Sequence, residues 1–505
     1  MTSPSMLPVR SDWEPKQTIF NLLLQYPDFE LRALAQIYTN TVDKATLWLA
    51  YPYDYKAYLG SIYTPNSGPS VYVPYLDAYA RCILNQTDPI MDLSVLNVVV
   101  MDRMVADFNP RAPYGPSTEN ASIMMSYVTE REQQAGTYEL PTLYVMPAGN
   151  FRIDPDIFRF SKPKQWLVGM GRNGITTIHC EPSTAGNNRL FTLNSDDNPY
   201  TTLVGCRFLN FSIRGYNPDV IGPTDAANRH RKVAFYSVCT SEPHFDVDIF
   251  NFNTGSANYG SEGGSEGLDY RGKELAKIIN PTWITDIPVH CRLNPKESGN
   301  QIDCDVMKIS DSYFIGTDGA NAEYLLKFDS GLNIKRFKMT GNNIWAAGKG
   351  SIELVETTGG VDALGFEIES LSHELAVAST APCLRIVKNG SSRMFDLHIR
   401  KYLPSFSAAG IELSGVRYSS IEGGGYYQFA GQSVSKKALT LGSGIRSLRV
   451  AGFMVPSLPS NGGANLLSLG TATKTFTTGD AVAGGTNASG ESLNQLDSLV
   501  IFDSP

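Results

Sequence analysis

Apolar and polar residues alternate in a pattern that returns along the second half of the chain. Apolar–any–apolar triplets begin at Leu326, Ile352, Leu384, Ile411 and Leu439, at steps of 26, 32, 27 and 28 residues. Alternation with a period of two indicates strands, and a repeat of this length indicates a solenoid or an array of blades. Because no amphipathic helical stretch lies inside the repeat, leucine-rich and helical repeats are disfavoured. The pattern predicts a mainly β protein folded as a right-handed parallel β-helix.

The middle residues of these triplets give an independent test of the repeat. In a parallel β-helix each strand pairs with its counterpart one rung, or turn of chain, further on, about 4.8 Å away. The middle side chains then form one outward column, in which opposite charges on neighbouring strands attract. The column contains Lys327, Glu353, Arg385 and Glu412, and its signs alternate. The alternation supports the register and predicts that Glu353 and Glu412 are structural.

A second strand-like piece follows most triplets, and it supplies the candidate chemistry. Aligning these pieces places Lys338, Glu367, Asp396 and Arg417 in one outward column, and Thr340, Glu369 and His398 in the neighbouring one. Two carboxylates on adjacent rungs would repel each other, so one pKa should rise, as a general acid requires.

The predicted catalytic residues are therefore Glu367 and Asp396 as acid and as base or nucleophile, with Glu369 and His398 in support. The alternative is that these are solvated charges relieved by Lys338 and Arg417.

Other patterns give weaker site hypotheses. The pairs Asp246/Asp248 and Asp303/Asp305 alternate along single strands, where geometry alone puts them on one face. Aromatic side chains that could stack on sugar rings, or else pack internally, are Trp283, Trp345, Tyr402, Tyr426 and Tyr427. The six histidines leave a Ser-His-Asp esterase open in principle. Residues 255–286 are glycine-rich and are expected to form a long excursion from the solenoid.

Composition narrows the class of protein. The chain has 505 residues, 45 glycines, 29 prolines and only 18% charged residues, which suits a turn-rich β protein. A net charge of −8 without a long basic run disfavours nucleic-acid binding. There is no apolar stretch of about 20 residues and no visible secretory signal, so membrane insertion is not expected. Seven scattered cysteines without a CxxC motif indicate reduced core thiols, and neither a metal site nor a cofactor site is predicted.

The chain divides into four predicted segments. Residues 1–112 contain nine tyrosines between positions 38 and 79 and are expected to form a separate domain, either an interface module or a small β-domain with its own core. Residues 113–175 hold a predicted helix capped by Ser117 and ending at Ala135, then strands that lead into the solenoid. Residues 176–455 form the solenoid, and residues 456–505 a C-terminal β cap, tip or tail, since a solenoid must cover its open ends.

Residues 143–178 carry a more specific pattern. A strand at Leu143–Met146 is followed by Pro147-Ala148-Gly149 and a second strand; further on, Gly169-Met170-Gly171-Arg172-Asn173-Gly174 precedes Ile175–Ile178. A dinucleotide site would require a helix after this G-x-G-x-x-G motif, but a strand is expected. The order of helix, strand and glycine-bearing turns resembles the start of the pectate-lyase-like β-helix in bacteriophage tailspikes. The resemblance covers about residues 115–455.

This resemblance implies a function and partners. It implies a homotrimer in the virion tail, made in the host cytoplasm and attached to tail or adaptor proteins through residues 1–112. It further implies that the β-helix recognises host surface polysaccharide and possibly cleaves it as a depolymerase, either a glycoside hydrolase or a lyase. Two alternatives are a non-enzymatic adhesion or structural tail protein, and a free polysaccharide-degrading enzyme.

Overall fold

The structure is a computed structural model of the 505-residue chain. It describes residues 97–101, 103–104, 120–134, 142–146, 148–172, 174–180, 188–194, 202–215, 232–252, 265–272, 274–293, 303–317, 322–356, 361–374, 381–389, 391–404, 410–425, 439–442, 444–455, 467–468, 476–478, 485–486 and 492–501. Strands predominate, and the described part holds one α-helix. The chain forms two compact units, one made of residues 1–181, 204–216 and 244–248, and the other of the remainder.

The first unit contains the helix and the strands that precede and follow it. Its elements are β1 (Asn97–Val100), α5 (Asn120–Gln134), β2 (Thr142–Val145), β3 (Gly149–Ile153), β4 (Arg159–Phe160), β5 (Gln165–Val168), β6 (Thr176–Cys180) and β9 (Arg207–Arg214). The chain pairs β1 with β2, β2 with β5, and β5 with β9, all parallel, while β3 pairs with β6 and β6 with β9. These are two walls of successive rungs, as the sequence pattern predicts.

The expected turns of this unit are present. The helix begins at Asn120, whose buried side-chain amide donates a hydrogen bond to the carbonyl of Arg152, so it lies close to the predicted 117–135 span. After the G-x-G-x-x-G motif the chain enters strand β6, which confirms that the motif does not open a helix. Gly169 is required for another reason, because a Cβ there would lie 2.7 Å from the carbonyl oxygen of Asn210.

The second unit contains most of the solenoid. Its elements are β7 (Arg189–Leu193), β10 (Val233–Val238), β11 (Thr240–Ser241), β13 (Glu266–Arg271), β14 (Lys277–Ile279), β15 (Thr282–Thr285), β16 (Ile287–Cys291), β17 (Asp303–Asp305), β18 (Lys308–Ser310), β19 (Tyr313–Ile315), β20 (Tyr324–Phe328), β21 (Asn333–Lys335), β22 (Lys338–Thr340), β23 (Asn343–Ala346), β24 (Gly350–Glu356), β25 (Ala363–Glu369), β26 (Leu371–Glu374), β27 (Leu384–Lys388), β28 (Met394–Pro404), β29 (Ile411–Ser414), β30 (Val416–Gly424), β31 (Leu439–Leu441), β32 (Arg446–Val455), β33 (Leu467–Ser468), β34 (Phe476–Thr478), β35 (Gly485–Thr486) and β36 (Ser492–Ile501). Two strands, β8 (Leu203–Val204) and β12 (His244–Phe252), contain residues of both units.

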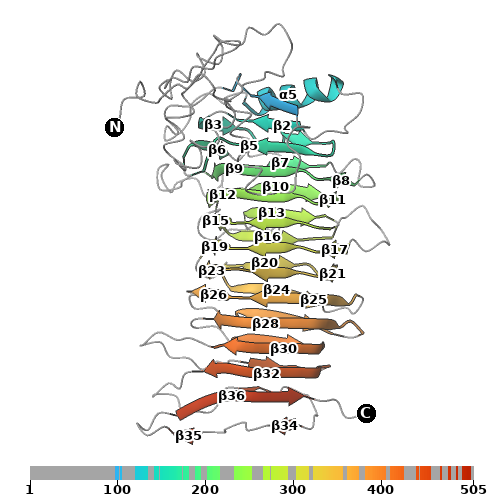
Figure 1. Ribbon diagram of the computed structural model, residues 1–505, viewed down its shortest axis with the longest axis vertical. Coiled ribbons are helices and arrows are strands. Elements are labelled where there is room, and N and C mark those ends of the chain that lie inside the picture. Colours follow the sequence, from blue (N-terminus) through green and yellow to red (C-terminus); the bar gives the residue numbers. More distant parts are fainter. Residues whose placement is uncertain are drawn as a thin grey trace, which may run out of the picture. The chain divides into compact units, whose positions relative to one another are not determined.

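One wall of this unit is a parallel sheet that runs β7, β10, β13, β16, β20, β24, β27, β29, β31 and β33, one strand per rung (Figure 1). The five predicted triplets lie in it, and their first residues pair in the predicted register, from Leu326 with Ile352 through to Ile411 with Leu439. These pairings join each strand to the strand one rung further along the chain, and they confirm the prediction of a parallel β-helix.

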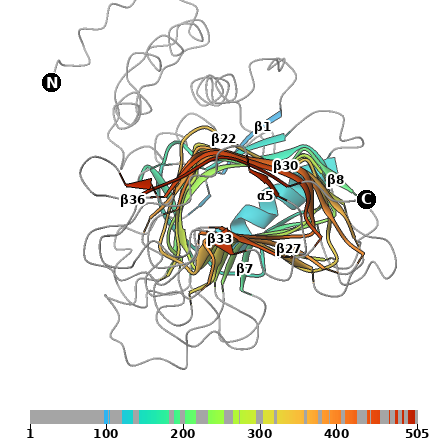
Figure 2. The same cartoon turned by 90° about the horizontal axis from the view of Figure 1, so that it is seen from below.

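The remaining walls are built the same way. One column of strands runs β14, β18, β22, β25, β28, β30 and β32, and another runs β15, β19, β23, β26 and the end of β28. Figure 2, which looks down the stack of rungs from below, shows β22 and β30 on one side and β27 and β33 on the opposite side. Apolar side chains from the facing walls fill the space between them, and they are almost all fully buried.

A stack of aromatic rings lies in this core. Trp283, Phe314 and Trp345 are on successive rungs, with ring centroids 5.5 Å and then 5.0 Å apart, and all three are fully buried. His373 is opposite Trp345 on the next rung and takes the next place in the column. Its Nε2–H donates to the carbonyl of Ala347, and burial lowers its pKa to about 4, so it is a neutral core residue.

Two expectations about these regions need correction. The excursion predicted for residues 255–286 is wrong beyond residue 265, because β13, β14 and β15 make a complete rung there. Gly267 lies in β13 of that rung. A side chain does not fit there, because a Cβ would lie 2.6 Å from the carbonyl oxygen of Pro288. The sugar-stacking role considered for Trp283, Trp345 and Tyr402 is also wrong, since all three are fully buried. Tyr426 and Tyr427 lie outside the described residues.

The last described strand changes the direction of pairing. Strand β36 pairs antiparallel with β32, from Leu448 opposite Ile501 to Val455 opposite Asn494, so it ends the parallel pairing in that column of strands, while β33 still pairs parallel with β31 in the first wall. The domain boundaries themselves, including those of residues 1–112, stay predictions. The six described cysteines are buried. Among the described residues, no helix has the length and apolar character needed to cross a membrane.

Candidate functional site

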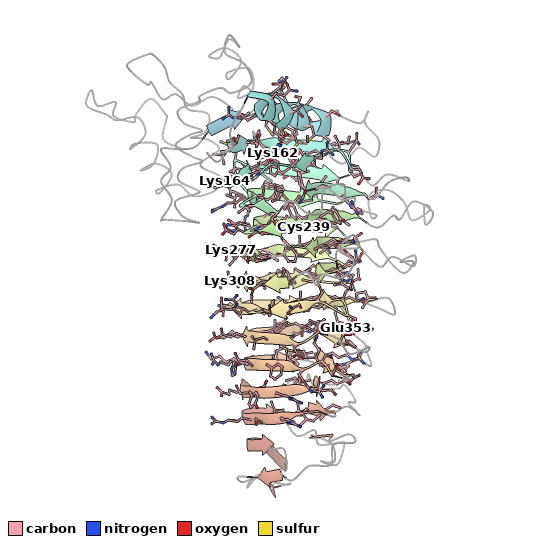
Figure 3. All side chains as sticks on the ribbon, turned by 90° about the vertical axis from the view of Figure 1, so that its right-hand side faces the viewer. Lys162, Lys164, Cys239, Lys277, Lys308 and Glu353 are labelled. Carbon is pink, nitrogen blue, oxygen red and sulfur yellow. The ribbon has the colours of Figure 1, made fainter. Side chains whose placement is uncertain are left out.

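An outward column of polar side chains runs along the β14–β18–β22–β25–β28–β30–β32 wall. It begins with Lys277, Lys308 and Lys338, which are directly opposite one another on three successive rungs. The residues that follow them, Ile278 and Ile309 among them, are buried, so the lysines point outward, and all three are exposed. Figure 3 shows Lys277 and Lys308 one above the other at one edge. We call these three residues the lysine column.

The lysine column is electrostatically unfavourable by itself. Like charges directly opposite each other on neighbouring strands repel, and the rungs are only about 4.8 Å apart. Lys338 is neutralised by Glu367, with 2.7 Å between Nζ and Oε2. The described part of the chain offers no ion-pair partner to Lys277 or Lys308. The column therefore presents uncompensated positive charge on a protein whose net charge is −8.

The predicted acid pair lies further along the same wall, but its register is wrong by two residues. Glu367 is opposite Lys338 as expected, yet its neighbour on the next rung is His398 and not Asp396. Asp396 has a left-handed backbone, with φ of 58°, and lies at an irregular point between two paired positions. Similarly, the partner of Arg417 is Phe395.

The rise in pKa that was expected for one of the two acids does not occur at Glu367. A hydrogen bond from Lys338 lowers the pKa of Glu367, against the opposing effect of partial burial, and Arg400 adds to the lowering. Oε1 of Glu367 is 3.2 Å from Nη1 of Arg400. A carboxylate held between two cations stays ionised and is poorly suited to act as a general acid near neutral pH. Whether Glu367 acts in catalysis stays a prediction.

The structure brings together two predicted residues and one that the sequence reasoning missed. Nε2 of His398 is 2.8 Å from Oδ1 of Asp396, and Nδ1 of His398 is 2.9 Å from Oγ of Ser420. Ser420 is directly opposite His398 on the next rung. A signal in the sequence could have found it, because Glu367, His398 and Ser420 each directly precede an isoleucine that points into the core.

Glu369, the fourth predicted residue, is in the neighbouring column. It is opposite Arg400, which in turn is opposite Glu422 on the following rung. Nε of Arg400 is 4.0 Å from Oε2 of Glu422. The expected place of Glu369 beside His398 in one column is therefore wrong, and its neighbour in register is a cation.

An exposed aromatic side chain accompanies these polar groups. Tyr418 is 65% exposed, and its ring stacks on that of Phe395 with centroids 6.4 Å apart and an interplanar angle of 18°. Both rings are on β28 and β30, the strands that carry His398 and Ser420. The exposed tyrosine offers a flat apolar contact face with a hydroxyl at its tip.

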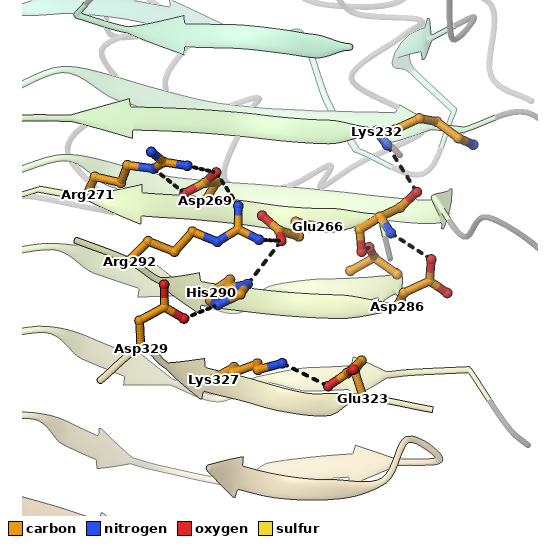
Figure 4. A network of polar contacts seen from close by, with 12 residues as sticks. Lys232, Glu266, Asp269, Arg271, Asp286, His290, Arg292, Glu323, Lys327 and Asp329 are labelled. Carbon is orange, nitrogen blue, oxygen red and sulfur yellow. Dashed lines mark hydrogen bonds and ion pairs between the residues drawn. The ribbon is translucent and has the colours of Figure 1, made fainter. Parts of the chain in front are cut away.

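A second polar cluster occupies the outer face of β13, β16 and β20 (Figure 4). His290 lies between two carboxylates, 3.0 Å from Glu266 and 2.8 Å from Asp329. Arg292 bridges Glu266 and Asp269, at 2.6 Å and 2.8 Å. Burial alone would lower the pKa of His290, but the hydrogen bonds to Asp329 and then to Glu266 raise it above its ordinary value.

This cluster adjoins the predicted ladder of alternating charge, which begins at Lys327, directly opposite His290. The outward column runs from Asp269 through His290 and Lys327 to Glu353, and then to Arg385 and Glu412. Arg385 contacts both of its neighbours, Glu412 at 2.9 Å and Glu353 at 3.4 Å. The predicted ladder is confirmed, and its mutual pairing indicates a structural role for this face.

The alternative acid pairs behave as structural groups where they are described. In the first unit, Asp246 and Asp248 both form ion pairs with Arg172 of the glycine-bearing turn. In the second unit, Asp305 pairs with Arg336 at 2.5 Å, while the side chain of Asp303 lies outside the described residues. We therefore take the wall that carries the lysine column and His398 as the candidate site.

Comparisons with known proteins give only distant likenesses. No family model matches the chain, and neither does any curated protein sequence. Among solved structures, the surface adhesin PfbA of Streptococcus pneumoniae is 11% identical, covering 81% of this chain and 99% of its own, with a TM-score of 0.41.

Two further solved structures resemble the chain to a similar degree. A tailspike protein mutant of the E. coli bacteriophage HK620, in complex with pentasaccharide, is 10% identical, covering 90% of this chain and 72% of its own, with a TM-score of 0.41. DFA-IIIase from Arthrobacter chlorophenolicus A6, in complex with DFA-III, is 10% identical over 74% of this chain and 87% of its own, with a TM-score of 0.43. The assignment of this chain as a parallel β-helix rests on its own strand pairings.

Proposed function

We propose that this protein is a bacteriophage tail protein that binds an acidic polysaccharide of the host surface along the lysine column. The observation that carries the proposal is the uncompensated charge of Lys277 and Lys308, stacked on successive rungs of a face that also carries His398 and exposed Tyr418. Repulsion within the column favours binding of a polyanion. A glycan with repeating carboxylate, sulfate or phosphate groups supplies such charge.

The assignment to a phage tail rests on the sequence resemblance and on its agreement with local structure. The order α5, β2, β3, β5 and β6, with its glycine-bearing turns, is the order that the resemblance implies. In this proposal, residues 1–112 attach the protein to tail or adaptor proteins, and the β-helix faces the host. The site residues Glu367, Glu369, Asp396 and His398 belong to the glycan-binding face.

An exposed apolar column supports the proposed homotrimer. Tyr313 and Ile344 are opposite each other on successive rungs, and Leu403 is two rungs beyond Ile344 in the same column. These three side chains are 40–45% exposed. A second copy of the chain is the occupant that we propose for this column. Mass measurement in solution should give three chains, and Ile344→Asp should weaken the assembly; a stable monomer would contradict this part of the proposal.

Glycan binding is tested with an array of purified bacterial surface polysaccharides, acidic and neutral. Full-length protein should bind acidic members, and Lys277→Gln/Lys308→Gln should reduce the signal at least tenfold. Lys401→Gln serves as a matched control, because Lys401 is exposed on β28 but lies outside the lysine column. Binding restricted to neutral glycans, or unchanged in the double variant, would contradict the proposal.

A virion protein and a free enzyme can be distinguished by whether the protein is present in purified phage particles. A virion protein should be found in purified phage particles by mass spectrometry, whereas a free enzyme should be absent from them. A purely adhesive tail protein and a depolymerase both bind glycan, and they differ in whether oligosaccharides appear after incubation with the bound glycan.

A further inference from the structure

Asp396, His398 and Ser420 are joined by hydrogen bonds in an arrangement that glycan binding alone does not require. The carboxylate of Asp396 contacts Nε2 of His398 at 2.8 Å, and the hydroxyl of Ser420 contacts Nδ1 of the same ring at 2.9 Å. The three residues come from two adjacent strands, β28 and β30, with His398 and Ser420 directly opposite each other. An acid, a base and a hydroxyl in this order are the parts of an activated nucleophile.

The chemistry of the partners fixes where the protons lie. An ionised carboxylate only accepts hydrogen bonds, so with a neutral imidazole the ring proton lies on Nε2 and is donated to Asp396. Nδ1 then has a free lone pair and accepts the hydroxyl proton of Ser420. This is the state in which an imidazole removes a proton from a nucleophile, with the carboxylate fixing its tautomer.

The neighbouring serine shows what a structural hydroxyl does at this place. The Oγ of Ser419 donates to the carbonyl of Arg417 at 2.8 Å and accepts from the backbone N–H of Leu397 at 3.0 Å. Its proton is therefore committed to the backbone. The proton of Ser420 is instead directed at a ring nitrogen, so the two adjacent serines have different chemistry.

Two of these three hydrogen-bonded residues are accessible to solvent. The side chain of His398 is 33% exposed and that of Asp396 is 57% exposed, while Ser420 is recessed at 7%. Arg449, which is exposed, lies directly opposite Ser420 on the following rung. A guanidinium at that place offers positive charge to an oxyanion that forms beside the Ser420 hydroxyl.

We propose that Ser420, His398 and Asp396 hydrolyse ester substituents on the hydroxyl groups of the bound glycan. Ser420 Oγ attacks the ester carbonyl carbon as His398 Nδ1 takes the hydroxyl proton. The tetrahedral adduct breaks the carbon–oxygen bond to the sugar, whose oxygen receives that proton from His398.

Water then attacks the acyl-serine and gives a proton to His398, and the carboxylic acid leaves as the proton returns to Ser420. Ser420 and His398 are the catalytic residues, and Asp396 is a positioning residue. The substrate class rests on the proposed glycan binding, but the nucleophile itself does not.

The experiment measures three properties of the full-length protein. A fluorophosphonate probe labels an activated serine, and peptide mass spectrometry locates the label. Acetate release is measured from O-acetylated acidic polysaccharide, and binding is measured separately to the same polysaccharide after its esters have been removed. The variants are Ser420→Ala and, as matched control, Ser414→Ala, a serine on β29 of the same unit that is 7% exposed, as Ser420 is.

The wild type and Ser414→Ala should be labelled on Ser420 and should release acetate, whereas Ser420→Ala should lose both and keep glycan binding. Asp396→Asn should lower kcat by about 100-fold or more with KM unchanged, and Asp396→Glu should restore part of the rate. A folded wild type that binds glycan but shows neither label nor acetate release overturns the esterase and leaves the proposed function standing. Labelled Ser420 without glycan binding overturns the proposed function alone.

Discussion

Glu367 and His398 are directly opposite each other on neighbouring rungs, in the column that begins with the exposed lysines. This pairing separates the two carboxylates that the sequence pattern placed side by side. Glu367 is held by Lys338 and Arg400, and Asp396 instead binds His398. The same wall thus divides into an ion-paired part around Glu367 and a hydrogen-bonded chain that ends at Ser420.

Glu367 should contribute stability that depends on its charge. Because Lys338 lowers its pKa below the ordinary 4.5, the ion pair contributes in full above that value and is lost as the pH falls through the folded-state pKa. Glu367→Gln should therefore unfold more easily than wild type at pH 7, by at most about 1 kcal/mol for a pair this exposed. Urea unfolding between pH 3 and pH 7 checks this. A difference that widens toward pH 3 would contradict the assignment.

His290 should give a pH dependence of the opposite sign. Its pKa is raised from 6.5, so the bonds of the imidazolium to Asp329 and Glu266 contribute fully below 6.5 and are lost as the pH rises through the folded-state value. The excess stability of wild type over His290→Asn should shrink between pH 6.5 and pH 9. A matched comparison is Lys327→Gln, one rung further along the same column. An excess that grows with pH would show that the ring is neutral in the folded protein.

His373 should oppose folding in acid. The ring is fully buried and its pKa is lowered from 6.5 to about 4, so between these values the unfolded chain binds a proton that the folded chain does not. Relative to His373→Phe, wild-type stability should fall by about 1.4 kcal/mol per pH unit below pH 6.5. Phe fits the aromatic column that precedes it, at the cost of the hydrogen bond to Ala347. Parallel pH profiles of the two proteins would contradict a neutral buried ring.

Repulsion within the lysine column should lower the free energy of unfolding of the protein. Removing one charge from three stacked lysines relieves repulsion, so Lys308→Gln should raise the free energy of unfolding by about 0.2–1 kcal/mol at low ionic strength. The gain should disappear in high salt, which screens exposed charges. The same variant should bind acidic glycan more weakly. A loss of both stability and binding would indicate that Lys308 has a structural partner.

The sequence predicts the first wall of the solenoid correctly for a clear reason. In the triplets from Leu326 to Leu441, two apolar residues flank one outward side chain, so only one register buries both. The middle charges add an independent check, because Arg385 contacts Glu353 and Glu412 as their signs require.

The second wall carries less information. Apolar and polar residues alternate from 395 to 399, so Phe395-Asp396-Leu397 and Leu397-His398-Ile399 fit the same pattern two residues apart. A slip of two residues keeps each side chain on its face, and periodicity cannot detect it. The positive φ of Asp396 and Gly365, at 58° and 75°, marks the irregularity that decides between the two registers. It depends on tertiary pairing, and therefore the contact of His398 with Ser420 was missed.

Aromatic residues were ambiguous for a related reason. Trp283 lies beside Ile284 in a short strand, and both side chains are apolar, so the pattern does not say which one points inward. The structure buries the tryptophan in the ring stack, whereas the exposed ring at the site belongs to Tyr418, which sits among polar residues in the sequence. Where an aromatic residue is next to another apolar residue in a strand, the sequence therefore does not indicate which of the two side chains is buried.

The most direct test of the central claim is the reactivity of individual lysines toward an acetylating reagent, with and without the acidic glycan that binds best on the array. Mass spectrometry reports the acetylation rate of each lysine in the full-length protein. The account predicts that Lys277 and Lys308 are protected several-fold by glycan while Lys401 is not. Glycan that binds without slowing acetylation of Lys277 and Lys308 would contradict it.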